Sequence, residues 1–169
     1  QTSEGFVAHA MRYFALCWKQ FLHDGSLRAA VASGQVDSSA ASVLLSEKAA
    51  RGAAVSLEDF GQRLCRRSLP ANLVSKLEEM CLCIGAREYA HANKVYMDIA
   101  IGAKKWQSET PVFVSFSMQR QDTEVKWTPD CGSHPVDDAG VREHVIVLRR
   151  LLTVAQAVRP NSDPSKNCG

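Results

Sequence analysis

One stretch decides the fold: Arg87-Glu-Tyr-Ala-His-Ala-Asn-Lys-Val-Tyr-Met-Asp-Ile-Ala-Ile-Gly102. Its apolar side chains recur at three- and four-residue spacing and share one helix face: Tyr89, Ala92, Tyr96, Ile99 and Ala100. Gly102 ends this helix, because a residue without a Cβ is favoured just past the last periodic position. About 35 residues without a helical period follow, and a loop of that length inside a compact domain is usually functional or disordered.

Helical periodicity predicts four further helices, which together with the first make a bundle of five. They cover residues 5–22, 40–68, 70–84 and 138–158. The last helix is apolar over an unusually wide arc, which is typical of a helix in the middle of a bundle. Its two adjoining apolar faces carry Val141, Val145, Leu148, Leu152 and Ala155, and Val147, Leu151, Val154 and Val158.

The region before and within the second helix has less definite boundaries. Residues 33–42 are small and polar and form a predicted connector, in which Asp37 or Ser38 is available to cap the next helix. Whether the second helical region is one helix or two stays open. Gly52 is one candidate break, and Ser56-Leu-Glu-Asp59 has the pattern of a capping box that would restart the helix.

Within the loop, about residues 103–136, apolar residues alternate at period two and predict a short β-hairpin. Its strands would hold Val112, Val114, Phe116 and Met118, and then Val125 and Trp127. We therefore expect an all-α fold, a five-helix bundle in one domain over residues 1–169, with this loop between the fourth and fifth helices. The chain begins with Gln1 instead of Met, which predicts that it is the C-terminal part of a longer protein.

The composition is that of an ordinary globular protein with one core. Of its 169 residues, 46% are hydrophobic and 22% are charged, and the formal net charge is +2. This positive excess is too small for a dedicated nucleic-acid binder, so any RNA contact has to be local. No apolar run approaches the ~18 residues of a membrane span, and no signal peptide precedes the fold.

Six cysteines raise the question of disulfides or a metal site: Cys17, Cys65, Cys81, Cys83, Cys131 and Cys168. Four of them fall inside helical apolar patterns, where a free cysteine behaves as a small buried hydrophobe. Cys81-Leu-Cys83 has the wrong spacing for a zinc finger or ribbon, and His91 is its one nearby further ligand. We expect buried thiols in a reducing compartment, with no metal and no cofactor.

Motifs of catalysis are absent from the sequence, which has no H-E-x-x-H, no glycine-rich phosphate loop, no nucleophile elbow and no C-x-x-C. His9 and His144 fall within predicted helices, where a surface or hydrogen-bonded histidine is commoner than a catalytic one. Asp137-Asp138 stands at the start of the last helix, where the helix dipole and the free amides favour negative charge. The chain is therefore predicted not to be an enzyme, with an unrecognised catalytic site as the alternative.

Two basic groups are candidates for binding. Arg63, Arg66 and Arg67 fall on one turn late in the second helical region. They form either a solvated helix face or an electrostatic docking patch for an acidic partner. Lys104-Lys105-Trp106 opens the long loop, where the lysines can meet a phosphate and the indole can stack on a base. The alternative is that Trp106 packs back onto the core of its own chain.

The stretch that ends at Gly102 resembles the signature of the pre-mRNA-splicing factor 18 family. The matching pattern is Arg87-Glu-Tyr-x-x-Ala-Asn-x-x-Tyr-x-x-x-Ala-Ile-Gly102, followed by Trp106. Further matches are Arg67-Ser-Leu-Pro-Ala71, Arg149-Arg-Leu-Leu-Thr153 and Asp163-Pro-Ser-Lys166. Their order and spacing agree over nearly the whole chain. The Ala-Asn…Ala-Ile-Gly block and the Asp-Pro-Ser-Lys tail are the most specific of these motifs.

The resemblance implies a compact five-helix bundle and a non-enzymatic nuclear splicing factor that acts at the second transesterification step, exon ligation. Such a protein associates with the U-five small nuclear ribonucleoprotein and binds a zinc-knuckle second-step factor through its helical surface. Its long loop would reach the catalytic centre of the spliceosome and position the exons, because the reacting groups belong to RNA. Loop candidates for contact with pre-mRNA or snRNA are Gly102, Lys104, Lys105, Trp106, Arg120, Lys126 and Trp127. Candidates for the partner-binding surface are Arg63, Arg66, Arg67 and Lys76.

The loop departs from the family pattern, which usually begins Gly-Asn-Ala-Pro-Trp-Pro-Ile-Gly-Val-Thr. Here Gly102-Ala-Lys-Lys-Trp-Gln-Ser-Glu-Thr-Pro-Val112 keeps the glycine and the tryptophan but neither flanking proline. The family's Gly-Ile-His is absent, with Ser115-Phe-Ser117 near its place. Either the chain serves an altered spliceosome or the loop has a different use. A helical protein-binding adaptor without an RNA role is therefore the alternative function.

Overall fold

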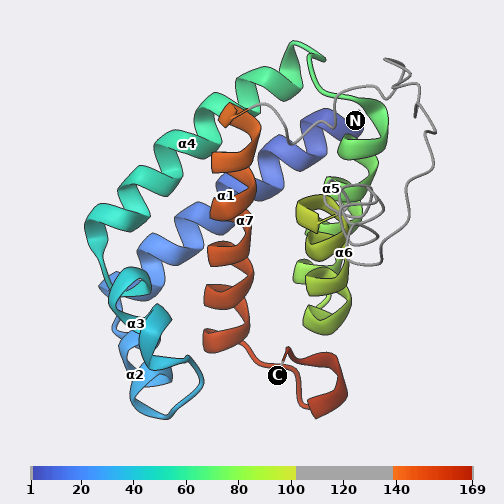
Figure 1. Cartoon of the computed structure of the whole chain (residues 1–169). Helices are drawn as coiled ribbons and strands as arrows, with labels where there is room; N and C mark the ends of the chain where they lie inside the picture. The colour runs from blue at the N-terminus through green and yellow to red at the C-terminus, as the bar shows by residue number, and fades with distance from the viewer. Residues whose placement is uncertain (1, 102–138, 169) are drawn as a thin grey trace, which may run out of the picture.

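The computed structural model describes residues 2–101 and 139–168, and in these residues the secondary structure is helical, without a strand. The all-α class is therefore confirmed for this part of the chain. The elements are α1 (Ser3–His23), α2 (Ser26–Ala32), α3 (Ser38–Leu44), α4 (Glu47–Cys65), α5 (Ala71–Gly85), α6 (Tyr89–Ile101), α7 (Ala139–Val158) and the 3-10 turn η2 (Pro164–Lys166) (Figure 1). None of the helices described is long and apolar enough to cross a membrane.

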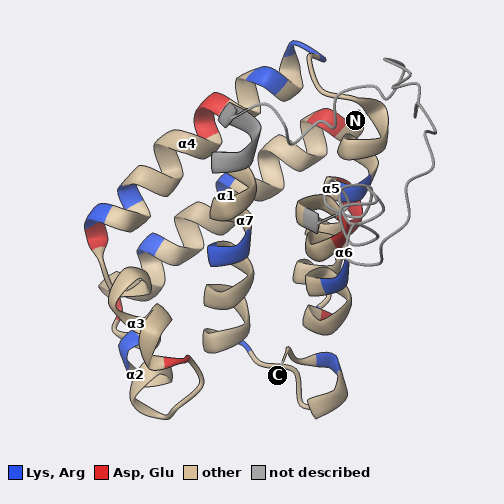
Figure 2. Ribbon diagram, viewed as in Figure 1, with Lys and Arg blue, Asp and Glu red and all other residues tan. Residues whose placement is uncertain are grey.

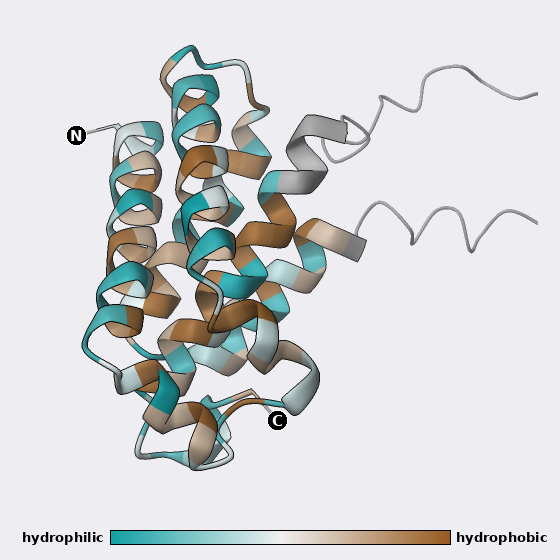
Figure 3. Cartoon of the chain, turned by 90° about the vertical axis from the view of Figure 1, so that its left-hand side faces the viewer, coloured by the Kyte–Doolittle hydropathy of each residue, from teal (hydrophilic) through white to brown (hydrophobic). Residues whose placement is uncertain are grey.

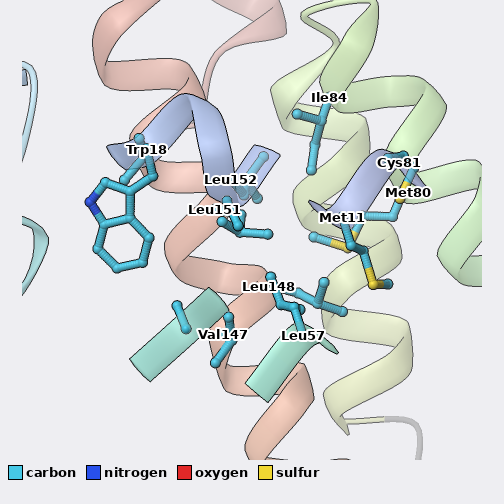
Figure 4. Close-up of a cluster of buried hydrophobic side chains, with 14 of the residues drawn as sticks. Met11, Trp18, Leu57, Met80, Cys81, Ile84, Val147, Leu148, Leu151 and Leu152 are labelled. Carbon is cyan, nitrogen blue, oxygen red and sulfur yellow. The ribbon is translucent and has the colours of Figure 1, made fainter. Parts of the chain in front are cut away.

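The last helix, α7, lies in the middle of the bundle, as its wide apolar arc predicts. It contacts α1, α2, α4 and α6, while α1 packs along α4 and against α5 (Figure 1). The core residues of α7 are Val145, Val147, Leu148, Leu151, Leu152, Val154 and Ala157. Figure 4 shows Leu151 between Trp18 and Ile84. Full burial of one such side chain contributes roughly 1.5–3 kcal/mol, so α7 is central to the stability of the fold.

Four predicted helices are confirmed to within two residues at each end, namely α1, α5, α6 and α7. The predicted apolar face of α5 is buried in full: Leu73, Leu77, Met80, Cys81 and Ile84. On α1 the predicted face is buried at Val7, Met11 and Trp18, while Phe14 and Phe21 pack half-buried against the core. Spacing therefore identified the inner face of α5 and most of that of α1. On α6, Tyr89, Ala92 and Ile99 are buried as predicted, whereas Tyr96 and Ala100 are half-buried and the buried Val95 was not predicted.

The expected number of five helices is wrong for the described residues, which contain seven α-helices. The two additional helices, α2 and α3, are short and lie between α1 and α4. Gly25, with φ of 80°, precedes α2 in the left-handed conformation that glycine adopts without strain. Asp37 caps α3 by accepting a hydrogen bond from the amide of Ser39, so the connector is shorter than predicted although its cap is confirmed.

The second helical region is two helices, and it breaks after Leu44 rather than at Gly52. The indole Nε1–H of Trp18 donates a hydrogen bond of 2.9 Å to the carbonyl of Leu44, at the end of α3. Ser46 then caps α4 with its side chain. Since α4 runs unbroken through Ser56, the predicted restart at that residue is wrong. The side chain of Ser56 is used for a contact with α7 instead.

The ends of α6 and α7 farthest from residues 102–138 are connected by side chains. The hydroxyl of Tyr89 donates to the carbonyl oxygen of Arg159 at 2.7 Å and lies 3.2 Å from that of Ala155. Lys166 Nζ lies 2.6 Å from Oε1 of Glu88, and this hydrogen bond raises the pKa of Lys166. The start of α6 is thereby tied to the segment that follows α7.

Some predictions lie outside the described residues, namely the β-hairpin, the rest of loop 103–136 and Cys131. The five described cysteines are free thiols. Cys81 is buried as predicted, whereas Cys65 is exposed because the inward position at the end of α4 is taken by Leu64. Pro70 is the N-cap of α5 rather than its first residue.

Candidate functional site

The helices that flank residues 102–138 end on the same side of the bundle. α6 finishes at Ile101 and α7 begins at Ala139, and both ends project toward one side in Figure 3. The C-terminal half of α4 lies beside the first turns of α7 (Figure 1). We call this region, built from the ends of α4 and α6 and the start of α7, the loop side.

On the loop side, His144 connects α7 to α4. Its ring is 5% exposed and stacks on Phe60, with the ring centroids 4.7 Å apart. Its Nδ1 lies 2.7 Å from Oγ of Ser56, and its Nε2 lies 3.2 Å from Oδ2 of Asp59. The three α4 residues are three and four positions apart and so share one helix face. His144 is thus a hydrogen-bonded helix histidine, as the sequence predicts.

A serine, a histidine and an aspartate in contact resemble a hydrolase triad in composition, but their geometry does not suit nucleophilic catalysis. Ser56 lies in the interior of α4, where the backbone amides serve the helix and offer no oxyanion hole. The ring of His144 is covered by Phe60. The Asp59 side chain is 61% exposed, whereas the aspartate that orients a catalytic histidine is buried. The cluster fits a structural connection between two helices.

Arg63, Arg66 and Arg67 lie together at the C-terminal end of α4, and we call these three residues the basic end (Figure 2). Arg63 Nε lies 3.7 Å from Oδ2 of Asp59, the oxygen that also faces His144. Arg67 Nε lies 3.9 Å from Oε1 of Glu4 in α1. Such exposed pairs contribute about 0–1 kcal/mol each. The negative end of the helix dipole favours guanidinium groups at this place.

Of the three residues of the basic end, Arg66 is the one whose guanidinium group has no partner in the described part of the chain. It is exposed, and it forms no hydrogen bond through its side chain and no ion pair with any residue that the structure describes. Among residues 2–101 and 139–168, the carboxylates of Asp59 and Glu4 lie close to Arg63 and Arg67. A surface of this kind attracts an acidic partner.

The backbone of Arg67 is in the left-handed conformation, with φ of 51°. Glycine usually takes this position after a helix, and another residue there costs of order 1 kcal/mol or more. The amide of Ser68 donates to the carbonyl of Arg63 at 3.2 Å and closes the helix end around it. Arg87 after α5 has the same conformation, with φ of 61°, so this backbone geometry serves to end a helix at both places.

Lys76, the fourth candidate for partner binding, is engaged elsewhere. It lies on α5, and its Nζ is 3.3 Å from Oδ2 of Asp98 on α6. The structure therefore gathers three of the four predicted partner-binding residues at the basic end and pairs the fourth with α6. The loop candidates for RNA contact lie outside the described residues: Gly102, Lys104, Lys105, Trp106, Arg120, Lys126 and Trp127.

Sequence reasoning missed the role of Ser56 and Asp59 at this site. Ser56 and His144 are 88 positions apart in the chain, so no local pattern indicates their contact. For metals, residues 2–101 and 139–168 contain no group of three or more His, Cys, Asp or Glu side chains placed to hold an ion.

Comparison with known proteins relates the chain to splicing proteins. Residues 16–161 match the sequence model of the Prp18 domain. Curated relatives named pre-mRNA-splicing factor 18 include those of Danio rerio and Mus musculus, each 30% identical over 111 residues, and that of Xenopus laevis, 28% identical over 111 residues. The aligned part is 65% of this chain and 31% of each relative, so the match spans less than a third of their length. No solved structure matches the chain.

Proposed function

The chain belongs to the Prp18 family, and from this premise we propose that it is a pre-mRNA splicing factor that promotes the second step, exon ligation with use of the 3′ splice site. The match over residues 16–161 carries the proposal, because it extends from within α1 to beyond α7. The protein is not an enzyme in this role. It works in the nucleus as one domain of the spliceosome, in association with the U-five snRNP.

The basic end is the proposed docking surface for a zinc-knuckle second-step factor. The exposed charge of Arg66 supports this assignment, because no described residue neutralises it. Arg67 makes a weak exposed pair with Glu4 that a partner's carboxylate can replace at little cost. Lys76 would contribute only if its pair with Asp98 opened.

Loop 103–136 is the proposed contact with pre-mRNA or snRNA, through Lys104, Lys105, Arg120 and Lys126 to phosphates and through Trp106 and Trp127 to bases. The proposed role of Gly102 is to end α6, because glycine is favoured just past the last helical residue. The role of the loop is positioning, because holding two reactants in place lowers the barrier without any reacting group from the protein. The contact of His144 with α4 supports this role, since it holds the start of α7 against the bundle.

The second candidate is a helical protein-binding adaptor without an RNA role. It is favoured by the departures of the loop from the family pattern and by the small net charge of +2. Salt distinguishes the two functions. Phosphate contacts release counterions and weaken steeply with ionic strength, whereas an apolar adaptor interface is much less sensitive.

The experiment that tests the proposal is complementation of a splicing extract depleted of the endogenous factor. The extract receives either the intact protein or a variant in which residues 103–136 are replaced by a Gly-Ser linker. Lariat intermediate and ligated exons are then quantified. We expect intermediate to accumulate with the variant and ligation to be rescued by the intact protein.

The other outcomes separate the parts of the proposal. Equal rescue by both proteins would mean that the helical body suffices and that the loop has no RNA role. No effect of either protein on either step would reject the splicing function, provided that both bind the zinc-knuckle factor or are shown to be folded by circular dichroism.

A further inference from the structure

A groove of about 730 Å³ lies between α3, α7 and the C-terminal segment. Its apolar lining consists of the exposed Val43, the half-buried Ala40 and the buried Val36, Leu44 and Leu152. Its charged lining consists of Asp37, Arg149 and Arg150. Both arginines belong to α7. Volumes of this size are typical of sites that enclose a small molecule or a few side chains of a partner.

The groove is preformed, because its walls are held by hydrogen bonds. On the α3 side, Trp18 binds the carbonyl of Leu44 at 2.9 Å. On the C-terminal side, the amide side chain of Gln156 exchanges two hydrogen bonds with the backbone of Cys168, of 3.0 and 2.9 Å. A rigid groove loses little entropy when a ligand binds, and this favours recognition.

The charge of the groove is not balanced by its own residues. Arg149 donates to the side-chain oxygen of Asn93 and lies over the ring of Tyr96, 5.7 Å from the centroid, and neither partner carries negative charge. Arg150 is half-buried, with no side-chain hydrogen bond and no ion pair to a residue that the structure describes. Guanidinium groups placed in this way favour a ligand with carboxylate or phosphate oxygens.

The lining holds one carboxylate, that of Asp37, beside the two guanidinium groups of Arg149 and Arg150, so its formal charge is +1. The carboxylate of Asp37 accepts hydrogen bonds from Ser39, through its amide and its hydroxyl, and so serves the cap of α3. Burial raises the pKa of the Cys168 thiol, which therefore stays neutral. A ligand has to supply the missing negative charge.

We propose that this groove binds an acidic peptide segment of a partner protein, with an aspartate or glutamate on Arg150 and a bulky apolar side chain against Val43 and Ala40. Val43 is 37% exposed, an apolar surface that a peptide side chain would cover. None of the described lining residues is aromatic, so the groove offers no stacking surface for the bases of single-stranded RNA. This interface is separate from the basic end and does not depend on a splicing role.

The test is selection of a displayed random peptide library on the immobilised full chain, followed by fluorescence anisotropy with the enriched peptides. We expect enriched peptides to combine an acidic residue with a bulky apolar one. Their dissociation constants should rise about tenfold or more for Arg150→Glu and for Val43→Asp. Arg51→Glu, the same charge change on the exposed face of α4, is the matched control and should leave binding unchanged.

Circular dichroism verifies that each variant is folded. Arg150→Gln, which removes the charge but keeps a long polar side chain, replaces Arg150→Glu if the latter unfolds the chain. The proposal would be overturned by enriched peptides without acidic residues or by equal binding to all variants. Binding of labelled oligouridine that is lost in Arg150→Gln would also overturn it, because the groove would then bind RNA.

Discussion

The Nε2 atom of His144 lies 3.2 Å from the Oδ2 atom of Asp59, and this contact joins the first turns of α7 to the outer face of α4. The same carboxylate oxygen lies 3.7 Å from Nε of Arg63. Asp59 thus stands between a buried histidine and the basic end. The carboxylate of Asp59 is therefore in reach of both α7 and the basic end.

Replacing His144 by alanine is expected to lower the free energy of unfolding by about 2–4 kcal/mol. The substitution removes the ring that packs on Phe60 and leaves Ser56 without this partner. Urea denaturation followed by circular dichroism measures the change. His9→Ala, on the exposed face of α1, is the control and should cost about 0.5 kcal/mol or less. Equal losses for the two variants would show that His144 does not connect the helices.

Reversing one charge of the basic end should separate binding from folding. Arg66→Glu is expected to weaken binding of the zinc-knuckle factor about tenfold or more and to leave the melting temperature unchanged, because Arg66 is exposed and makes no described pair. Isothermal titration calorimetry at two salt concentrations measures the effect. Arg28→Glu, on the exposed face of α2, is the control. If both variants bind as the unaltered protein does, the docking surface lies elsewhere.

Replacing Arg67 by glycine is expected to raise the free energy of unfolding. Arg67 has φ of 51°, and glycine relieves this strain by about 1 kcal/mol. The same substitution at Arg66, whose φ is −78°, should instead destabilise by about 0.5 kcal/mol, since glycine gains nothing there. Thermal unfolding of the two variants gives the comparison. A lower melting temperature for Arg67→Gly than for Arg66→Gly would contradict the strain at position 67.

Sequence predicted the helices in which apolar side chains recur at regular helical intervals. Leu73, Leu77 and Ile84 face the core at helical intervals, and α5 forms where they predict it. The break after Leu44 was missed although Ser46, the N-cap of α4, is a local signal for it. The hydrogen bond from the indole of Trp18 to the carbonyl of Leu44 joins residues 26 positions apart, and no local pattern indicates it.

The same distinction holds for the sites. The three arginines of the basic end are close in sequence, and their grouping on one turn was therefore predictable. The cluster around His144 and the groove beside Arg150 bring together residues from different helices. Such contacts depend on how α7 packs against α3 and α4. Local sequence patterns therefore do not predict them.

Alkylation should distinguish the cysteines. Burial, with a smaller effect of Glu78, raises the pKa of the Cys81 thiol from 9.0 to about 12. The exposed Cys65 should therefore react with iodoacetamide in the native protein at mildly alkaline pH, whereas Cys81 should react only after unfolding. Mass spectrometry of the digested protein locates the label. Equal rates for the two thiols would mean that the interface of α5 is open to solvent.

The same shift in pKa has a consequence for stability. Below pH 9.0 the Cys81 thiol is protonated in both the folded and the unfolded chain, so its contribution does not change with pH. Between 9.0 and about 12 the unfolded chain loses the proton while the folded chain keeps it, and stability falls as the pH rises. Urea midpoints measured across this interval, with Cys81→Ala as reference, check the sign.

The hydrogen bonds of Tyr89 and the contacts of His144 hold α6 and α7 to the bundle through side chains outside residues 102–138. These two helices therefore keep contacts with the bundle that do not depend on the length of the connection between them. Closing a longer connection adds only about 0.6 kcal/mol for each doubling of its length. By this measure the length of the connection is a weak constraint on the stability of the helices that it joins.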